Sequence, residues 1–282
     1  MAFLPYFQSA KHLQCSLCGP TSPASAEAGQ YMVSKSNIII TDDPSHLAMV
    51  AANAFAAAAR YSVNTRGRFV AAVSGGSTPR GMFRILAEEP YVLEIPWDKM
   101  HIFWVDERCV PENDAASNYG AAKKDFLNRV PIPKTQVYPM PGRLPPKTGA
   151  QTYQKALMAF FHLKCGQFPT FDKIFLGMGD DGHIASLFPG HSATDEEKKL
   201  VVAVKGGDPY VSRLTMTLPV LNGSRQIIFL ISGKAKAAAV KMVFEGDQAP
   251  LPAKKIHALD GDVTWLLDRE AASLLPGETI GA

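Results

Sequence analysis

Short apolar segments alternate with longer amphipathic ones along most of this chain. The short segments are rich in Val, Ile, Leu and Phe, and they lack the in-and-out alternation of a half-exposed strand, so they predict strands that are buried on both faces. The predicted strands are NIIIT (37–41), RFVAAV (68–73), HIFWV (101–105), FDKIFLG (171–177), QIIFLIS (226–232) and DVTWLLD (262–268).

Helical patterns follow most of these strands. Asp43 followed by Pro44 is typical of a helix start, and the alanine-rich segment after it predicts a helix to about Tyr61. Because helices alternate with buried strands, we expect an α/β fold with a doubly wound, mostly parallel sheet flanked by helices, in a three-layer, Rossmann-like arrangement. Further helices are predicted at 79–88, 115–129 and 233–246.

The organisation of the chain predicts a single α/β catalytic domain over residues 36–282. Residues 1–35 have the small, polar composition of a disordered leader, and Cys15 and Cys18 within it form a CxxC that lacks the second pair of a metal site. Two segments, 130–147 and 190–213, read as insertions, and we expect one or both to form a small lid.

The composition excludes several classes of partner. Lys and Arg exceed Asp and Glu by only three charges and are scattered along the chain, so no nucleic-acid partner is expected. No apolar run approaches the ~20 residues that cross a bilayer, and four cysteines without disulfide-framework spacing favour a cytoplasmic location. An anionic small molecule is therefore the expected partner of a monomer or weak homodimer.

A glycine-rich loop follows the second predicted strand. Hydroxyl groups and flexible backbone before a helix that starts near Pro79 are suited to binding a phosphate with free amide groups. The loop lacks the lysine of a nucleoside-triphosphate loop, and a tight turn with a Thr cap is the alternative interpretation. The candidate residues are Ser74, Gly75, Gly76, Ser77 and Thr78.

Three basic side chains are candidates for the same ligand. Arg108 comes at a strand end, where it could reach a phosphate bidentately, although an ion pair with Glu107 would explain it equally well. Arg213 heads a later strand. Lys234 and Lys236 lie at the start of a helix, where a cation opposes the helix dipole unless an anion binds nearby.

The segment MGDDGHIASLFPG (178–190) places a histidine directly after the fourth strand. His183 is suited to proton transfer near neutral pH, and Asp181, two residues earlier, could fix its tautomer. An Asp-Gly turn with a solvent-facing histidine is the alternative. Because no GxSxG nucleophile is present, activated water is the simpler attacking species.

Together these segments resemble the 6-phosphogluconolactonase family, within the larger group that includes glucosamine-6-phosphate deaminases. The resemblance rests on SGGSTP, WVDERCVPENDAASNYG, the segment around His183, SRLTMTLPVLN with SGKAKA, and VTWLLDREAA, in family order over about residues 36–275. It implies hydrolysis of 6-phospho-D-glucono-1,5-lactone, a step of the oxidative pentose phosphate pathway, without a metal or organic cofactor.

The resemblance also implies roles for the candidate residues. His183 would be the general base that activates water, and Asp181 would orient it. The Ser74 to Thr78 loop and Arg108 would hold the phosphate, with Arg213 and Lys236 as further cationic contacts. Lys236 is preferred to Lys234 because the family spacing Gly-x-x-Lys-Ala counts from Gly233. Backbone amides between Gly179 and Gly182 are candidates for stabilising the oxyanion.

Two alternative functions follow from the same segments. The deaminases continue their DGHIA-like segment into Asn-Glu-Pro, where this chain has SLFPG, which favours the lactonase. A non-catalytic sugar-phosphate sensor would keep the phosphate loop and lose the base, whereas His183 is present.

Overall fold

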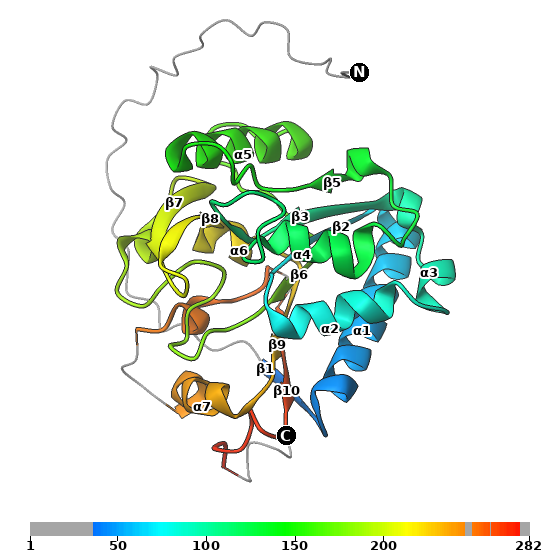
Figure 1. The fold of residues 1–282 in the computed structure, drawn as a ribbon, viewed down its shortest axis with the longest axis vertical. Coiled ribbons are helices and arrows are strands. Elements are labelled where there is room, and N and C mark those ends of the chain that lie inside the picture. Colours follow the sequence, from blue (N-terminus) through cyan, green and yellow to red (C-terminus); the bar gives the residue numbers. More distant parts are fainter. Residues whose placement is uncertain (1–35, 246–249, 260, 277–282) are drawn as a thin grey trace, which may run out of the picture. The chain divides into compact units, whose positions relative to one another are not determined.

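A seven-stranded parallel sheet runs through the described part of the chain, which comprises residues 36–245, 250–259 and 261–276 of this computed structural model (Figure 1). All six predicted strands are confirmed, and the mostly parallel α/β class with them. The predicted leader with Cys15 and Cys18 lies outside the described residues. In sheet order the strands are β1 (Ser36–Thr41), β10 (Asp262–Asp268), β9 (Gln226–Ile231), β6 (Lys173–Leu176), β2 (Phe69–Val73), β3 (Met100–Trp104) and β5 (Val137–Tyr138).

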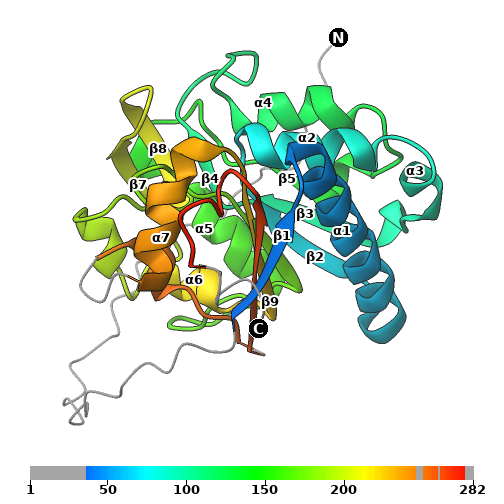
Figure 2. The ribbon, with the colours of Figure 1, turned by 90° about the horizontal axis from the view of Figure 1, so that it is seen from below.

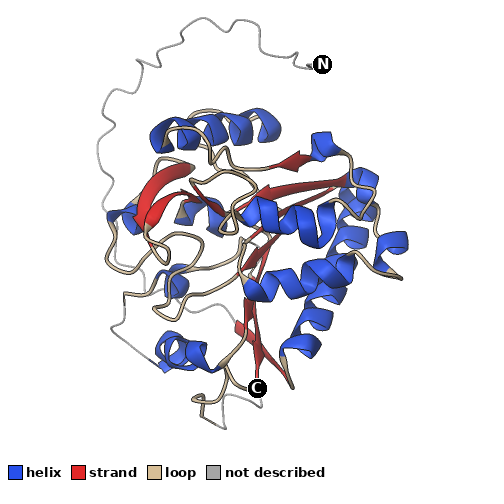
Figure 3. Cartoon of the chain, in the orientation of Figure 1, coloured by secondary structure: helices blue, strands red, loops and turns tan. Residues whose placement is uncertain are grey.

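Helices cover both faces of this sheet, which explains why its strands are mostly apolar (Figures 2 and 3). On one face α1 (Pro44–Arg66) packs against α2 (Ser77–Leu86), with the short α3 (Tyr91–Glu94) beyond it. In the core, the Phe55 ring of α1 meets the rings of Phe69 and Phe175 at centroid distances of 5.5 and 5.3 Å. The other face carries α5 (Pro146–Phe161), α6 (Leu218–Asn222) and α7 (Ala237–Glu245). Within the described ranges, no helix has the length and apolar character needed to span a membrane.

Helix boundaries follow local capping more closely than the apolar pattern. The Asp43 carboxylate accepts hydrogen bonds from the amides of Ser45 and His46, each at 2.8 Å, so α1 begins as predicted. The predicted bounds 115–129 are wrong: α4 (Asn118–Ala122) starts three residues later, because Ser117 is its N-cap, and it continues as a π turn over Lys123–Leu127.

A second, antiparallel sheet stands beside the first and was not predicted. It consists of β4 (Asp106–Arg108), β8 (Val211–Met216) and β7 (Val201–Gly206) in that order. The segment 190–213, which read as an insertion, supplies β7 and the start of β8, and the segment 130–147 supplies the edge strand β5. A lid role for either segment stays a prediction.

The connections of the sheet reverse direction between the neighbouring strands β2 and β6. From β2 the chain continues outward to β3 and β5, and it then returns to β6 on the other side of β2 before continuing to β9 and β10. Ligands of open parallel sheets bind outside the carboxyl ends of strands at such a reversal. The residues that follow β2, β3, β6 and β9 are therefore expected to share one site.

Lys173 lies at the opposite, amino-terminal end of β6 and predicts a pH-dependent stability effect. Burial lowers the pKa of its ammonium group to about 8 from 10.5. Below pH 8 the folded protein keeps the buried charge on Lys173, which lowers the free energy of unfolding. Between pH 8 and 10.5 the folded protein loses this proton while the unfolded chain still holds it, so the loss of stability diminishes as the pH rises. Lys173→Met should raise the free energy of unfolding by about 1–3 kcal/mol at pH 7 and by less at pH 10.

Urea unfolding at both pH values measures this effect. Lys155→Met is the matched control, because Lys155 lies exposed on α5. This substitution should change the free energy of unfolding little at either pH. A Lys173→Met variant that is no more stable than the wild type at pH 7 would contradict the expectation.

Candidate active site

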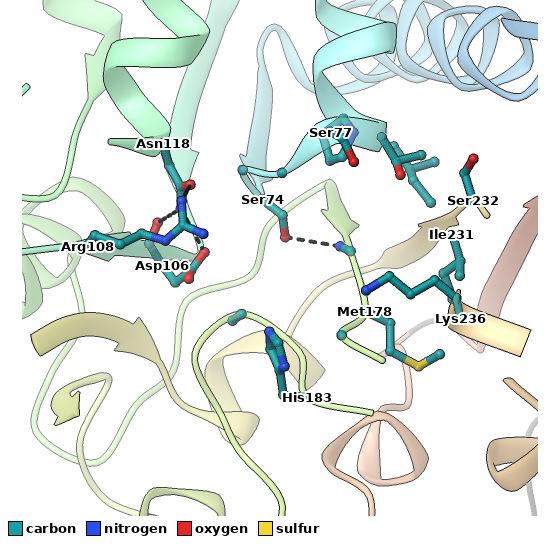
Figure 4. A pocket seen from close by; sticks show the side chains of 18 of the residues that line it. Ser74, Ser77, Asp106, Arg108, Asn118, Met178, His183, Ile231, Ser232 and Lys236 are labelled. Carbon is teal, nitrogen blue, oxygen red and sulfur yellow. Dashed lines mark hydrogen bonds between the residues drawn. The ribbon is translucent and has the colours of Figure 1, made fainter. Parts of the chain in front are cut away.

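A pocket of about 220 Å³ opens at the carboxyl ends of β2, β6 and β9, between the two sheets (Figure 4). In Figure 4, Arg108 and Asn118 lie on one side, Lys236 lies on the opposite side, and His183 and Ser77 face the space between them. Asp181 does not line the pocket, but its carboxylate is hydrogen-bonded to His183. The predicted residues that line the pocket are Ser74, Gly75, Gly76, Ser77, Thr78, Arg108, His183, Arg213 and Lys236.

The glycine-rich loop carries the chain from β2 into α2. The Ser74 hydroxyl is buried and accepts a hydrogen bond from the Gly177 amide at 3.2 Å, which ties the end of β2 to the end of β6. Gly76 has a φ of 99°, and no side chain caps α2, so the alternative of a Thr cap is wrong. The first amides of this ten-residue helix stay available to an anion.

Arg108 extends from β4, and the protein does not use all of the hydrogen-bond donors of its guanidinium group. Its Nη1 donates to the Ala116 carbonyl and to Asn118 Oδ1, each at 2.8 Å, whereas its buried Nε has no partner among the described residues. Glu107, the alternative ion-pair partner, accepts hydrogen bonds from the backbone amides of Arg108, Asn118 and Tyr119. A buried donor without a partner is costly, and a ligand oxygen at Nε would remove that cost.

Arg213 lies opposite Arg108 in the β4–β8 register and is almost completely buried. Its Nε donates to the Gly206 carbonyl at 2.9 Å, and its Nη2 donates to the carbonyls of Asp208 and Pro209 at 3.2 Å. Burial and the nearby Arg108 charge lower the pKa of the Arg213 guanidinium. Two cations held this close favour an anionic ligand between them.

Lys236 belongs to the single turn of 3-10 helix, Lys234–Lys236, between β9 and α7. Its side chain lines the pocket, while Lys234 is exposed and does not line it. The resemblance-based choice between these two lysines therefore agrees with their positions.

His183 and Asp181 form the one acid–base pair that the described residues place at this pocket. Nδ1 of His183 lies 2.6 Å from Asp181 Oδ1, which also accepts the His183 backbone amide at 2.9 Å. Burial raises the pKa of the Asp181 carboxyl, but these hydrogen bonds outweigh it, and the pKa lies below its usual value. Because an ionised carboxylate only accepts, Nδ1 carries the proton and Nε2 of the neutral ring is left as the base.

Gly179 makes this pairing possible. A Cβ at this position would overlap with the His183 imidazole and lie 2.5 Å from Asp181 Oδ1. Gly179→Ala should therefore separate the pair and lower kcat by about 10- to 100-fold, because small displacements of reacting groups have effects of this size. Steady-state kinetics test this expectation, and a melting curve close to that of the wild type would show that the fold is retained. A normal kcat in a folded variant would contradict it.

The predicted oxyanion donors need correction. The Gly179 amide donates to the His183 carbonyl at 2.8 Å, and the Gly182 amide donates to the Gly179 carbonyl at 3.2 Å. Both amides are used within the loop. The prediction therefore narrows to the amides of Asp180 and Asp181, and for these it stays a prediction.

The pocket offers donors and cations in place of a metal-binding arrangement. Among the described residues, no group of three His, Cys, Asp or Glu side chains is placed to hold a metal ion.

Three polar residues of the pocket were missed as site residues: Asp106, Asn118 and Ser232. Asp106 and Asn118 are both about 95% buried, and the Asn118 amide donates to the Asp106 carboxylate at 3.2 Å. Asp106 could have been found as a carboxylate between an apolar strand and Arg108. Asn118 carried no local signal, because its place in the pocket depends on the packing of α4.

The comparisons with known proteins agree with this fold and pocket. The family model described as glucosamine-6-phosphate isomerases/6-phosphogluconolactonase matches residues 42–265. A Synechocystis protein named 6-phosphogluconolactonase is 40% identical over 218 residues, which cover 76% of this chain and 88% of the relative.

Solved structures show the same similarity. The Trypanosoma brucei 6-phosphogluconolactonase has a TM-score of 0.77 at 28% identity, covering 86% of this chain and 99% of that one. A monomeric glucosamine-6-phosphate deaminase has a TM-score of 0.72 at 25% identity, and the match covers 84% of this chain and 99% of that one. Since the family model and the Synechocystis relative both span most of the sequence, the chain belongs to the glucosamine-6-phosphate isomerase/6-phosphogluconolactonase family.

Proposed function

We propose that the chain hydrolyses 6-phospho-D-glucono-1,5-lactone to 6-phospho-D-gluconate. One observation carries this proposal: His183, which is hydrogen-bonded to Asp181, lines the same pocket as the cations Arg108, Arg213 and Lys236. A base alone would suit many reactions, whereas a base beside a cluster of cations suits a phosphorylated substrate. The names of the Synechocystis and Trypanosoma relatives support the same reaction.

The phosphate would bind between the α2 N-terminus and the cationic side chains. The amides after Gly76 and the free Nε of Arg108 supply hydrogen bonds that an anionic oxygen can accept. Arg213 and Lys236 would neutralise the remaining charge. Binding the non-reacting phosphate in this way would position the lactone carbonyl near His183.

Hydrolysis would then proceed in two proton transfers. Nε2 of His183 takes a proton from water as the water oxygen bonds to the carbonyl carbon, and the ionised Asp181 stabilises the imidazolium. The tetrahedral intermediate collapses, the bond from carbon to the ring oxygen breaks, and the imidazolium returns its proton to that oxygen. The products are the open-chain hydroxyl and a carboxylic acid, which ionises. This route uses no metal or organic cofactor.

A substrate comparison tests the proposal against the deaminase alternative. The lactone is generated in situ with glucose-6-phosphate dehydrogenase, and its hydrolysis is compared with ammonia release from glucosamine 6-phosphate by the same preparation. We expect acceleration of the first reaction alone. Ammonia release without lactone hydrolysis would assign the deaminase activity instead.

The proposal extends to the setting of the enzyme. Residues 36–282 would act as a single catalytic domain, as a monomer or weak homodimer, in the cytoplasm. Light scattering during gel filtration measures the oligomeric state, and a fluorescent fusion of the full chain confined to another compartment would contradict the location.

A further inference from the structure

Ser186 lies three residues after His183, in a turn with unusual backbone geometry. Ala185 has a φ of 48°, a conformation that residues with a Cβ rarely adopt, and Ile184 pairs with Leu187 across the turn. Such a conformation persists only where the surrounding contacts hold it. Ala185 itself lines the pocket, so the contacts that hold this turn also bear on the shape of the site.

The second sheet supplies those contacts through Ser186, which is fully buried. The Ser186 amide donates to Thr215 Oγ1 on β8 at 3.2 Å, and the Ser186 hydroxyl donates to Asp106 Oδ2 on β4 at 2.7 Å. The loop that carries His183 is thereby attached to the strand that carries Arg108.

The hydrogen bonds continue from Asp106 to Arg108 itself (Figure 4). Nδ2 of Asn118 donates to Asp106 Oδ1 at 3.2 Å and to the Asp106 carbonyl at 3.0 Å, and Asn118 Oδ1 accepts from Arg108 Nη1 at 2.8 Å. Asn118 also packs against the glycine-rich loop, because a Cβ on Gly75 would overlap with its side chain. One buried series of hydrogen bonds therefore joins Ser186 to the Arg108 side chain.

We propose that Ser186 is a positioning residue that fixes His183 relative to Arg108 through Asp106 and Asn118. This inference rests on the proposed function, in which His183 activates water and Arg108 holds the phosphate. Removing the hydroxyl leaves Asp106 Oδ2 buried without a donor, and a carboxylate in that state draws other donors toward it. Asn118 already donates to the other oxygen of this carboxylate and accepts from Arg108, so the disturbance reaches Arg108 as well as the turn at Ala185.

Ser186→Ala tests the inference, with Ser224→Ala as a matched control. Ser224 is equally buried, and its hydroxyl also donates a hydrogen bond, to the Gln226 carbonyl at 2.8 Å, but it lies at the amino-terminal end of β9, away from the pocket. Both variants should lose thermal stability. Ser186→Ala alone should lower kcat by about 10- to 100-fold and raise KM, because it displaces both reacting and binding groups. Ser186→Cys, which retains a weak donor, should recover part of the loss.

Phosphate binding separates this inference from the proposed function. Isothermal titration calorimetry measures the binding of inorganic phosphate to the wild type and to both alanine variants. This measurement requires no turnover. We expect about tenfold weaker binding for Ser186→Ala and unchanged binding for Ser224→Ala. If the wild type binds phosphate but does not hydrolyse the lactone, the proposed function fails while the weakened binding still supports the coupling.

Equal kcat, KM and phosphate affinity in Ser186→Ala and Ser224→Ala would overturn the inference, since Ser186 would then contribute to stability alone. If Ser186→Ala does not fold, the same comparison is made with Ser186→Cys. Wild-type values in that variant would overturn the inference, and a partial loss in both kcat and phosphate affinity would support it.

Discussion

Replacement of His183 with alanine should lower kcat for lactone hydrolysis by about 100- to 10,000-fold, the range typical for loss of a positioned general base. The imidazole is the only group among the described pocket residues that is paired with an ionised carboxylate through one nitrogen and left with a free second nitrogen. KM should change little, because the cationic residues and the α2 N-terminus do not depend on the imidazole.

Kinetics with lactone generated in situ measure this change. His46→Ala is the matched control: His46 is half exposed near the start of α1, where it contacts Asp42, and it does not line the pocket. Its kcat should equal that of the wild type. A His183→Ala variant within twofold of wild-type kcat would leave the reaction possible but remove the proposed base.

Replacement of Arg108 with alanine should raise KM by about 10- to 100-fold, the equivalent of one or two charge-assisted hydrogen bonds. The substituted side chain supplies the unpartnered Nε and one of the two facing guanidinium charges. Arg108→Lys should recover only part of the affinity, because an ammonium group retains the charge but not the planar donor pair.

The control for this series is Arg60→Ala. Arg60 pairs with Glu94 on the surface of α1, where both side chains are about half exposed, and it is not part of the pocket lining. Its KM should be unchanged, since exposed pairs contribute little. An Arg108→Ala variant with normal KM would show that the phosphate binds elsewhere.

Most of the central sheet could be predicted from the sequence because its inner strands are buried on both faces, whereas the edge strand β1 exposes Asn37 and Ile39. β2 is buried at every position, so FVAAV reads as a strand without knowledge of its neighbours. The second sheet carries no such signal. β4 has three residues, all polar, and its strand character arises from pairing with β8, more than one hundred residues later. Helix α5 was missed for a different reason, since its Pro-rich start continues the composition of the connector before it.

The candidate site shows the same division between local and distant causes. Residues in the loops that follow strands, such as Ser74 after β2 and His183 after β6, could be placed at the pocket because parallel strands end at one edge of the sheet. Asn118 and Ser186 could not, because their contacts with Asp106 depend on how α4 and the 183–187 turn pack against β4. A serine within the apolar segment IASLF was the available signal for Ser186.

Direct observation of the lactone tests its hydrolysis by this protein without coupling enzymes. The decay of 6-phospho-D-glucono-1,5-lactone to the open-chain acid is followed by NMR in buffer alone and with increasing wild-type enzyme. We expect a decay rate that rises in proportion to enzyme concentration, well above the spontaneous rate. A rate equal to that in buffer, at enzyme concentrations comparable to the lactone, would contradict this expectation.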